Sequence, residues 1–197
     1  MKLAIKARTP AYYRFCFHSK EVLMSSFLLL LLAIAGRVIP HTWINFSAVG
    51  GSLLFFGARR PLRQAILPVA LLMATDYYLT VFAYNYAFHV QGYLLTWVWY
   101  VAAILLGRIL LRDQVSVVRV GAATVLSATS FFALTNFAVW ANSGMYPHTV
   151  AGLSACFVSA LPFYRNDLLS TALVLSMAFG LPALARRMAE REGRAAA

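Results

Sequence analysis

The chain has 197 residues, of which 61% are hydrophobic and 12% are charged, and its mean hydropathy is +0.72. A soluble domain of this length needs far more polar surface, so the composition excludes that class and indicates an integral membrane protein. The formal net charge of +11 would suggest nucleic-acid binding in a soluble protein, but the positions of the basic residues explain it as membrane topology.

The N-terminal arm, residues 1–21, is basic and aromatic. It carries five Lys or Arg side chains among Tyr and Phe residues, which suits contact with an anionic cytoplasmic leaflet. A terminal segment with the usual excess of positive charge on the cytoplasmic side explains the same pattern. Both interpretations place the arm at the cytoplasmic surface.

Residues 22–185 contain enough apolar sequence for a six-helix transmembrane domain. The six predicted spans are residues 22–39, 44–58, 65–84, 92–111, 118–140 and 168–185. The second is short and rich in small residues such as Gly50 and Gly57, which allow close helix packing in lipid. Val150 to Leu161 is also apolar but ends at Pro162 and is too short to cross, which predicts a re-entrant or surface helix. The predicted fold class is an all-α integral membrane bundle of six spans plus this short helix before the last one.

The distribution of basic residues gives the orientation. Six spans place both termini on one side, together with five basic residues of the arm, three near residue 60, three at residues 108–119 and four in the tail, residues 186–197. Only Arg37 and Arg165 fall on the other side. The positive-inside rule therefore predicts that both termini are cytoplasmic.

The third span contains one carboxylate, Asp76. An ionisable group at this depth costs roughly 2.5–3.5 kcal/mol unless it faces protein or a wet cavity. Asp76 shares a helix face with Thr80 and Tyr84 because they follow at four-residue steps. Three roles remain open for Asp76: a structural partner of Arg37, Tyr or backbone donors, a ligand-binding group, or a proton or ion relay.

Aromatic and amide side chains gather at the predicted outer side. All four Trp and all five Asn residues lie at or near outer span ends, and Asn136 shares a face of the fifth span with Thr129, Ala133 and Trp140. An aromatic belt and turn chemistry explain this pattern, and so does a ligand cavity. Neutral donors beside aromatic rings suit an uncharged or zwitterionic, partly flat ligand. The candidate substrate-binding residues are Asp76, Tyr77, Thr80, Tyr84, Asn136, Trp140, Tyr146 and Asn45.

No motif predicts catalysis, a metal site or a cofactor. Gly152 to Ala155 imitates the serine motif of rhomboid-type proteases, but no histidine follows His148 to activate the serine. No Cys/His spacing suits zinc and no glycine-rich loop suits phosphate. Cys16 and Cys156 are expected on opposite sides of the membrane and therefore unpaired. Cys156 is either inert packing or a reactive outer thiol.

Several motifs resemble those of a family of small bacterial membrane proteins. They are Arg37-Val-Ile-Pro40, Asn45-Phe-Ser-Ala-Val-Gly50, Asp76-Tyr-Tyr-Leu-Thr80, Asn136-Phe-Ala-Val-Trp140, Met145-Tyr-Pro147 and Leu161-Pro-Phe-Tyr-Arg-Asn166. That family is similar to the S-components of energy-coupling-factor vitamin transporters, especially the BtuM-type cobalamin transporters. The resemblance covers residues 35–185 and implies six helices around an outward-opening cavity, with a rocking movement that delivers the ligand inward.

The predicted function is a solitary S-component-like transporter in a bacterial cytoplasmic membrane. It would take up a vitamin-sized molecule such as cobalamin or another corrinoid, with the lipid bilayer as its other partner and no nucleic acid. The first span, LLLLLAIAGRV, lacks the AxxxA pattern that S-components use on a shared ATPase module, which argues against that partner. Two alternatives stay open: a non-transporting membrane scaffold or assembly factor, which predicts no outward cavity, and a membrane enzyme that uses Cys156.

Overall fold

The computed structural model describes residues 19–38 and 47–195, and every element in these two ranges is helical. The elements are α1 (Ser19–Val38), α2 (Val49–Arg59), η1 (Leu62–Gln64), α3 (Ile66–Tyr78), η2 (Leu79–Ala83), α4 (Val90–Leu111), α5 (Val117–Asn142), α6 (Val150–Leu175), η3 (Ser176–Gly180) and α7 (Leu181–Ala195). The π-helical turn η2 continues α3, and the π-helical turn η3 joins α6 to α7. The described residues therefore form six helices, and the prediction of an all-α fold is confirmed for them.

Four of these helices are long and apolar enough to cross a membrane: Leu62–Ala83, Val90–Leu111, Val117–Asn142 and Val150–Glu192. Large apolar side chains stand on their outer surfaces, among them Ile66, Ile109 and Val158, which are 77%, 72% and 64% exposed. A surface of this kind suits lipid rather than water. By length and composition, the chain is a helical membrane protein.

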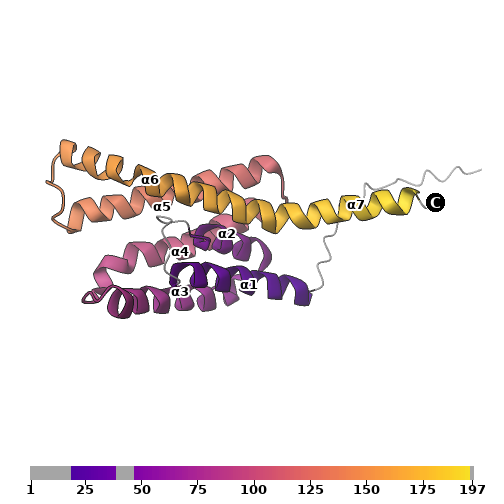
Figure 1. Ribbon diagram of the computed structural model, residues 1–197, viewed down its shortest axis with the longest axis horizontal. Helices are drawn as coiled ribbons and strands as arrows, with labels where there is room; N and C mark the ends of the chain where they lie inside the picture. Colours follow the sequence, from indigo (N-terminus) through magenta and orange to yellow (C-terminus); the bar gives the residue numbers. More distant parts are fainter. Residues whose placement is uncertain (1–18, 39–46, 196–197) are drawn as a thin grey trace, which may run out of the picture.

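The predicted break at Pro162 is wrong. Pro162 lies inside α6, and the helix runs on through η3 into α7 (Figure 1). The span from Val150 to Glu192 alone has 43 residues and is about 65 Å long at about 1.5 Å per residue. A proline removes one helical hydrogen bond, but helices packed in a membrane bundle tolerate it because neighbouring groups satisfy the freed carbonyl. The predicted short helix, the predicted sixth span and much of the predicted tail are thus one helix.

The helix observed in place of the predicted second span, α2, is shorter than that span. Helix α2 has 11 residues, which is about 16 Å of helix, and this is about half the thickness of a bilayer core. Every residue from Val49 to Ala58 is buried. Residues 39–46, which include the predicted start of this span, lie outside the described residues. Helix α2 is therefore a half-length helix at the centre of the bundle, with α1 and α3 on one side and α5 and α6 on the other (Figure 1).

Small residues let α2 approach α4 closely, as the sequence predicted. A Cβ on Gly57 would lie 1.9 Å from the Ile104 carbonyl oxygen, and a Cβ on Gly107 would lie 2.1 Å from the Leu54 carbonyl oxygen. Only glycine fits at either position, because both clashes are with backbone. The two glycines fix the place where α2 and α4 cross.

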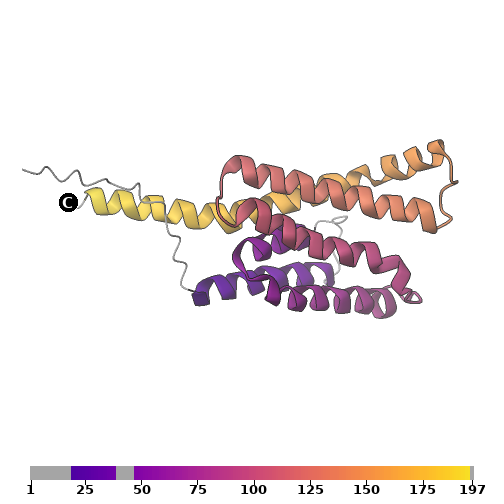
Figure 2. The same ribbon diagram turned by 180° about the vertical axis from the view of Figure 1, so that it is seen from behind.

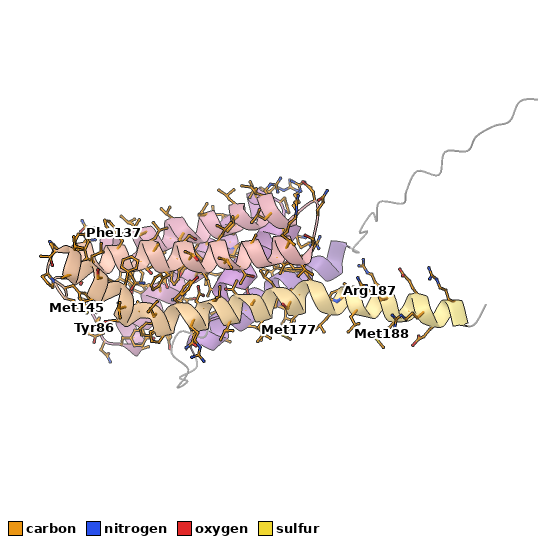
Figure 3. The ribbon with its side chains drawn as sticks, turned by 90° about the horizontal axis from the view of Figure 1, so that it is seen from above. Tyr86, Phe137, Met145, Met177, Arg187 and Met188 are labelled. Atoms are coloured by element: carbon orange, nitrogen blue, oxygen red, sulfur yellow. The ribbon has the colours of Figure 1, made fainter. Side chains whose placement is uncertain are left out.

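The ends of the bundle differ in character. The start of α1, the α2–α3 and α4–α5 connections and α7 lie at one end, and the α3–α4 and α5–α6 connections lie at the other (Figures 1 and 2). The first end carries Arg59, Arg60, Arg112 and Arg119. Figure 3 shows α7, which carries Arg187, projecting past the other helices at this end. We call the first end the basic end and the second the connection end.

A candidate ligand-binding cavity

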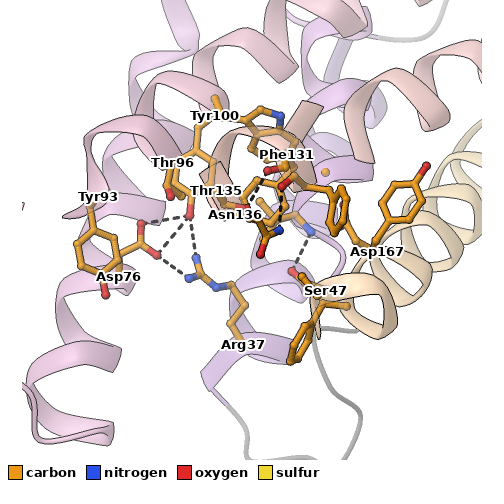
Figure 4. Close-up of a pocket in the computed structure, with 17 residues that line it drawn as sticks. Arg37, Ser47, Asp76, Tyr93, Thr96, Tyr100, Phe131, Thr135, Asn136 and Asp167 are labelled. Carbon is orange, nitrogen blue, oxygen red and sulfur yellow. Dashed lines mark hydrogen bonds and ion pairs between the residues drawn. The ribbon is translucent and has the colours of Figure 1, made fainter. Parts of the chain in front are cut away.

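A cavity of about 340 Å³ lies among α1 to α6 in the half of the bundle toward the connection end (Figure 4). Helix α2 begins only at Val49, so among the described residues no helix fills the centre of this half. The start of α2 forms part of the wall through Val49 and Gly50. Ser47 holds this start in place: its Oγ accepts a hydrogen bond from Val49 N at 3.3 Å, and its carbonyl accepts one from Ser170 Oγ on α6 at 2.7 Å.

The wall of the cavity is largely aromatic. Trp99 is 3% exposed, donates from Nε1 to Ser130 Oγ at 3.0 Å and lies against Phe131 with ring centroids 4.6 Å apart. Phe132 and Tyr164 pair from α5 and α6 with centroids 4.9 Å apart. The aromatic wall residues besides Tyr100 are Tyr93, Trp99, Phe131, Phe132, Phe163 and Tyr164. Rings locked by such contacts offer flat faces for a ligand to stack on.

A buried ion pair forms one side of the cavity. Arg37 Nη2 on α1 donates to Asp76 Oδ1 at 2.5 Å, and its Nη1 donates to the Tyr100 hydroxyl at 3.2 Å. That hydroxyl donates to Asp76 Oδ2 at 3.1 Å, and Trp97 Nε1 donates to the same oxygen at 3.0 Å. The Asp76 side chain is 1% exposed and the Arg37 side chain 22%. Of the roles open for Asp76, the structural partnership with Arg37 and Tyr is the one the structure shows.

Thr80 supports the wall from behind. Its Oγ1 donates to the Asp76 carbonyl at 2.7 Å and lies 2.5 Å from the Tyr93 hydroxyl. Tyr93 lines the cavity, and its ring stacks on Phe88 and on Trp97 at centroid distances of 5.1 and 6.1 Å, while those two rings also lie 6.3 Å from each other. Thr80 therefore positions a wall residue and does not itself line the cavity.

The predicted binding residues fall into three groups. Asp76 and Asn136 line the cavity. Tyr77 and Tyr84 are 47% and 60% exposed and lie off the wall, as Thr80 does. Trp140, in the last turn of α5, and Tyr146, in the α5–α6 connection, are not on the wall, and Asn45 lies outside the described residues.

Local helix geometry explains these placements. Leu79 to Ala83 is a π-helical turn, in which Tyr84 N donates to Leu79 O, so the step from Thr80 to Tyr84 is no longer one ordinary helical turn. On α5 the wall carries Phe132, Thr135 and Asn136, which lie at three- and four-residue steps. The predicted face through Thr129 and Trp140 is rotated from this one by part of a turn.

The wall residues of α4 and α6 are not among the binding residues predicted from the sequence. On α4, Tyr93, Thr96 and Tyr100 recur at helical spacing, and this signal was available. On α6, Tyr164 and Asp167 are also one face of a helix. The predicted helix end at Pro162 places Asp167 in a connection, so the sequence pattern does not reveal this face.

The serine and cysteine considered for catalysis lie away from the cavity. Ser154 Oγ donates to Val150 O of its own helix at 2.9 Å. Cys156 is a free thiol, 2% exposed, with Sγ 3.4 Å from Asn136 O, and it does not line the cavity. Cys16 lies outside the described residues. Within residues 24–38 and 47–192, no group of three or more His, Cys, Asp or Glu side chains is arranged to hold a metal ion.

Comparison with known proteins gives one match. The model of a family described as a family of unknown function, DUF6580, matches residues 17–192. No curated protein and no solved structure matches the chain.

Proposed function

We propose that this chain, which belongs to the DUF6580 family because that match covers most of its length, binds a small molecule in the cavity and carries it across a bacterial cytoplasmic membrane. The observation that carries the proposal is the cavity of about 340 Å³, with stacked aromatic faces and a few fixed polar groups inside a helical membrane bundle. Small-molecule sites have this composition and volumes of about 300–1,000 Å³.

The orientation is part of the proposal. The basic end would face the cytoplasm, because Lys and Arg are enriched in cytoplasmic connections. The cavity lies toward the opposite, connection end, so it would receive its ligand from outside. This arrangement agrees with the resemblance to S-components, which implies an outward-opening cavity and a rocking movement.

The size of the cavity narrows the choice of ligand. A volume of about 340 Å³ is at the lower limit for drug-sized molecules, and a corrinoid is larger than these. Binding of an intact corrinoid would require the helices to move apart. Cys156 is also off the wall. The proposed ligand is therefore a compact molecule of vitamin size or smaller.

The two alternatives gain no support. The close glycine contacts of α2 are made with α4 of the same chain, so these small residues serve internal packing rather than a partner helix. An enzyme that uses Cys156 needs a reachable thiol, and this one is 2% exposed.

Native mass spectrometry tests the proposed binding with a matched pair of variants. Asn136 and Asn142 on α5 both donate from Nδ2 to the carbonyl one turn earlier, at 2.8 and 3.0 Å, but only Asn136 lines the cavity. A co-purified small molecule should be released from the wild type and from Asn142→Ala and be depleted in Asn136→Ala. Equal occupancy in all three proteins would count against the cavity.

Transport is tested separately with the compound so identified. The protein is reconstituted in vesicles, and accumulation of the labelled compound is measured. Uptake above protein-free vesicles supports a transporter. Binding without uptake would make the protein a receptor and overturn the transport part of the proposal.

A further inference from the structure

The charges on the cavity wall do not balance. Among the described residues, three charged side chains line it: Arg37, Asp76 and Asp167. Arg37 and Asp76 form the ion pair described above, so one charge compensates the other. Asp167 is a second carboxylate, and no further positive charge on the described wall compensates it.

Asp167 has no cationic partner in the part of the chain that the structure describes. That part holds two ion pairs, Arg37–Asp76 and Arg112–Asp113, and neither includes it. Its Oδ2 atom is buried and makes no hydrogen bond. Residues 39–46, which join the wall residues Arg37 and Ser47 in sequence, contain no Lys or Arg, and their one ionisable side chain is His41.

A carboxylate at this position stays charged only beside a compensating group, and otherwise takes up a proton. Burial of a charge without a partner is strongly unfavourable, and ionisable residues inside membrane bundles normally face a cavity and pair there. Asp167 is also one helical turn from Phe163 and Tyr164, which line the same cavity. A carboxylate beside aromatic faces is a favourable surrounding for a positively charged nitrogen, through a charge-assisted hydrogen bond and cation–π contact.

We infer that the ligand is an organic cation, an ammonium or similar nitrogen on a compact aromatic or apolar body, and that Asp167 binds its charged group. This inference rests on the proposed function and names the chemical class of its ligand. It replaces the expectation of an uncharged or zwitterionic ligand. A carboxylate or phosphate ligand is disfavoured because Arg37, the one basic residue on the described wall, is engaged by Asp76.

A metal ion fits the cavity less well than an organic cation. One water occupies about 30 Å³, so a volume of about 340 Å³ would remain mostly empty around a bare ion. Hard cations also require about six oxygen ligands at short distance, whereas most of this wall is aromatic.

Three probes of similar shape and different charge test the inference. The unfolding midpoint of the purified protein in detergent at pH 7 is measured against 2-phenylethylamine, 2-phenylethanol and 3-phenylpropionate. We expect the amine to raise the midpoint in a saturable way, and the alcohol and the carboxylate to raise it little. Replacement of sodium by potassium in the buffer should change nothing.

Asp167→Asn should weaken the apparent affinity for the amine at least about tenfold, because the charge-assisted contact is lost. Asp113→Asn, which removes a carboxylate with an 87% exposed side chain outside the cavity, should leave that affinity unchanged. If Asp167→Asn does not fold, the three-probe series on the wild type still decides between the charge classes.

Each contrary result has its own meaning. Equal stabilisation by the amine and the alcohol overturns the cationic ligand and leaves the proposed binding function intact. If sodium but not potassium raises the unfolding midpoint and the amine does not, the organic-cation inference is overturned in favour of a metal ion. If Asp167→Asn lowers the midpoint without changing amine affinity, Asp167 only complements the start of α2, and the inference fails. No response to any of the three probes overturns the cationic ligand, whereas the binding cavity itself is decided by the native mass spectrometry of Asn136→Ala and Asn142→Ala.

Discussion

Arg37 Nη2 lies 2.5 Å from Asp76 Oδ1, and this contact joins the last turn of α1 to the last turn of α3 at the cavity wall. The carboxylate also receives hydrogen bonds from Tyr100 and Trp97 of α4. One acid thus connects three helices. It is both the support of the wall and part of its surface.

Loss of the acid should destabilise the bundle. Asp76→Asn leaves Arg37 without its counter-charge, and we expect a loss of about 3 kcal/mol, because breaking a buried pair is strongly unfavourable and Arg37 retains some exposure. The measurement is reversible unfolding in detergent. The control is Asp113→Asn, which breaks an exposed pair with Arg112 and should change stability by less than about 0.5 kcal/mol. Equal effects of the two variants would refute the structural role of Asp76.

The crossing of α2 and α4 should not tolerate a methyl group. In Gly107→Ala the new Cβ would lie 2.1 Å from the Leu54 carbonyl oxygen, so the helices must separate. We expect a loss of about 3 kcal/mol, at the upper end for overpacking, since the obstacle is backbone. Gly121→Ala is the matched control, because a Cβ there meets nothing within 4 Å. It should stabilise α5 by up to about 1 kcal/mol, and a similar loss in both variants would contradict the packing.

The orientation can be tested with single cysteines. In a background with Cys16→Ser and Cys156→Ser, Ser143→Cys places a thiol in the α5–α6 connection and Asp113→Cys places one in the α4–α5 connection. Both positions are exposed. A membrane-impermeant maleimide added to intact bacterial cells with a permeabilised outer envelope should label position 143 and spare position 113. Labelling of position 113 alone would show that the protein has the opposite orientation in the membrane.

The long spans were predictable from sequence. The predicted spans 65–84, 92–111 and 118–140 agree closely with Ile66–Ala83, Val90–Leu111 and Val117–Asn142. Each is an apolar run of bilayer length that ends at polar or turn-forming residues, and lipid leaves a helix as the available structure for such a run. Length and composition alone are therefore enough to predict these three helices and their approximate ends.

The elements that shape the cavity were not predictable in the same way. Pro162 is a helix breaker by local rules, and only packing within the bundle keeps α6 continuous. The π-helical turn at Leu79 to Ala83 has no simple sequence signal, yet it turns Tyr84 away from Asp76. The late start of α2 at Val49, which opens the cavity, also has no cap that sequence rules recognise, since Ala48 makes no side-chain cap bond.

The most direct measurement of the central claim compares two neighbouring tryptophan substitutions by native mass spectrometry. Thr135→Trp should fill the cavity, because Thr135 is on its wall, whereas Leu134→Trp adds the same ring beside it, at a residue that is 39% exposed and does not line the cavity. We predict that the wild type and Leu134→Trp release the same bound small molecule and that Thr135→Trp releases none. If Thr135→Trp carries as much of that molecule as the wild type, the ligand is not in this cavity and the account is contradicted.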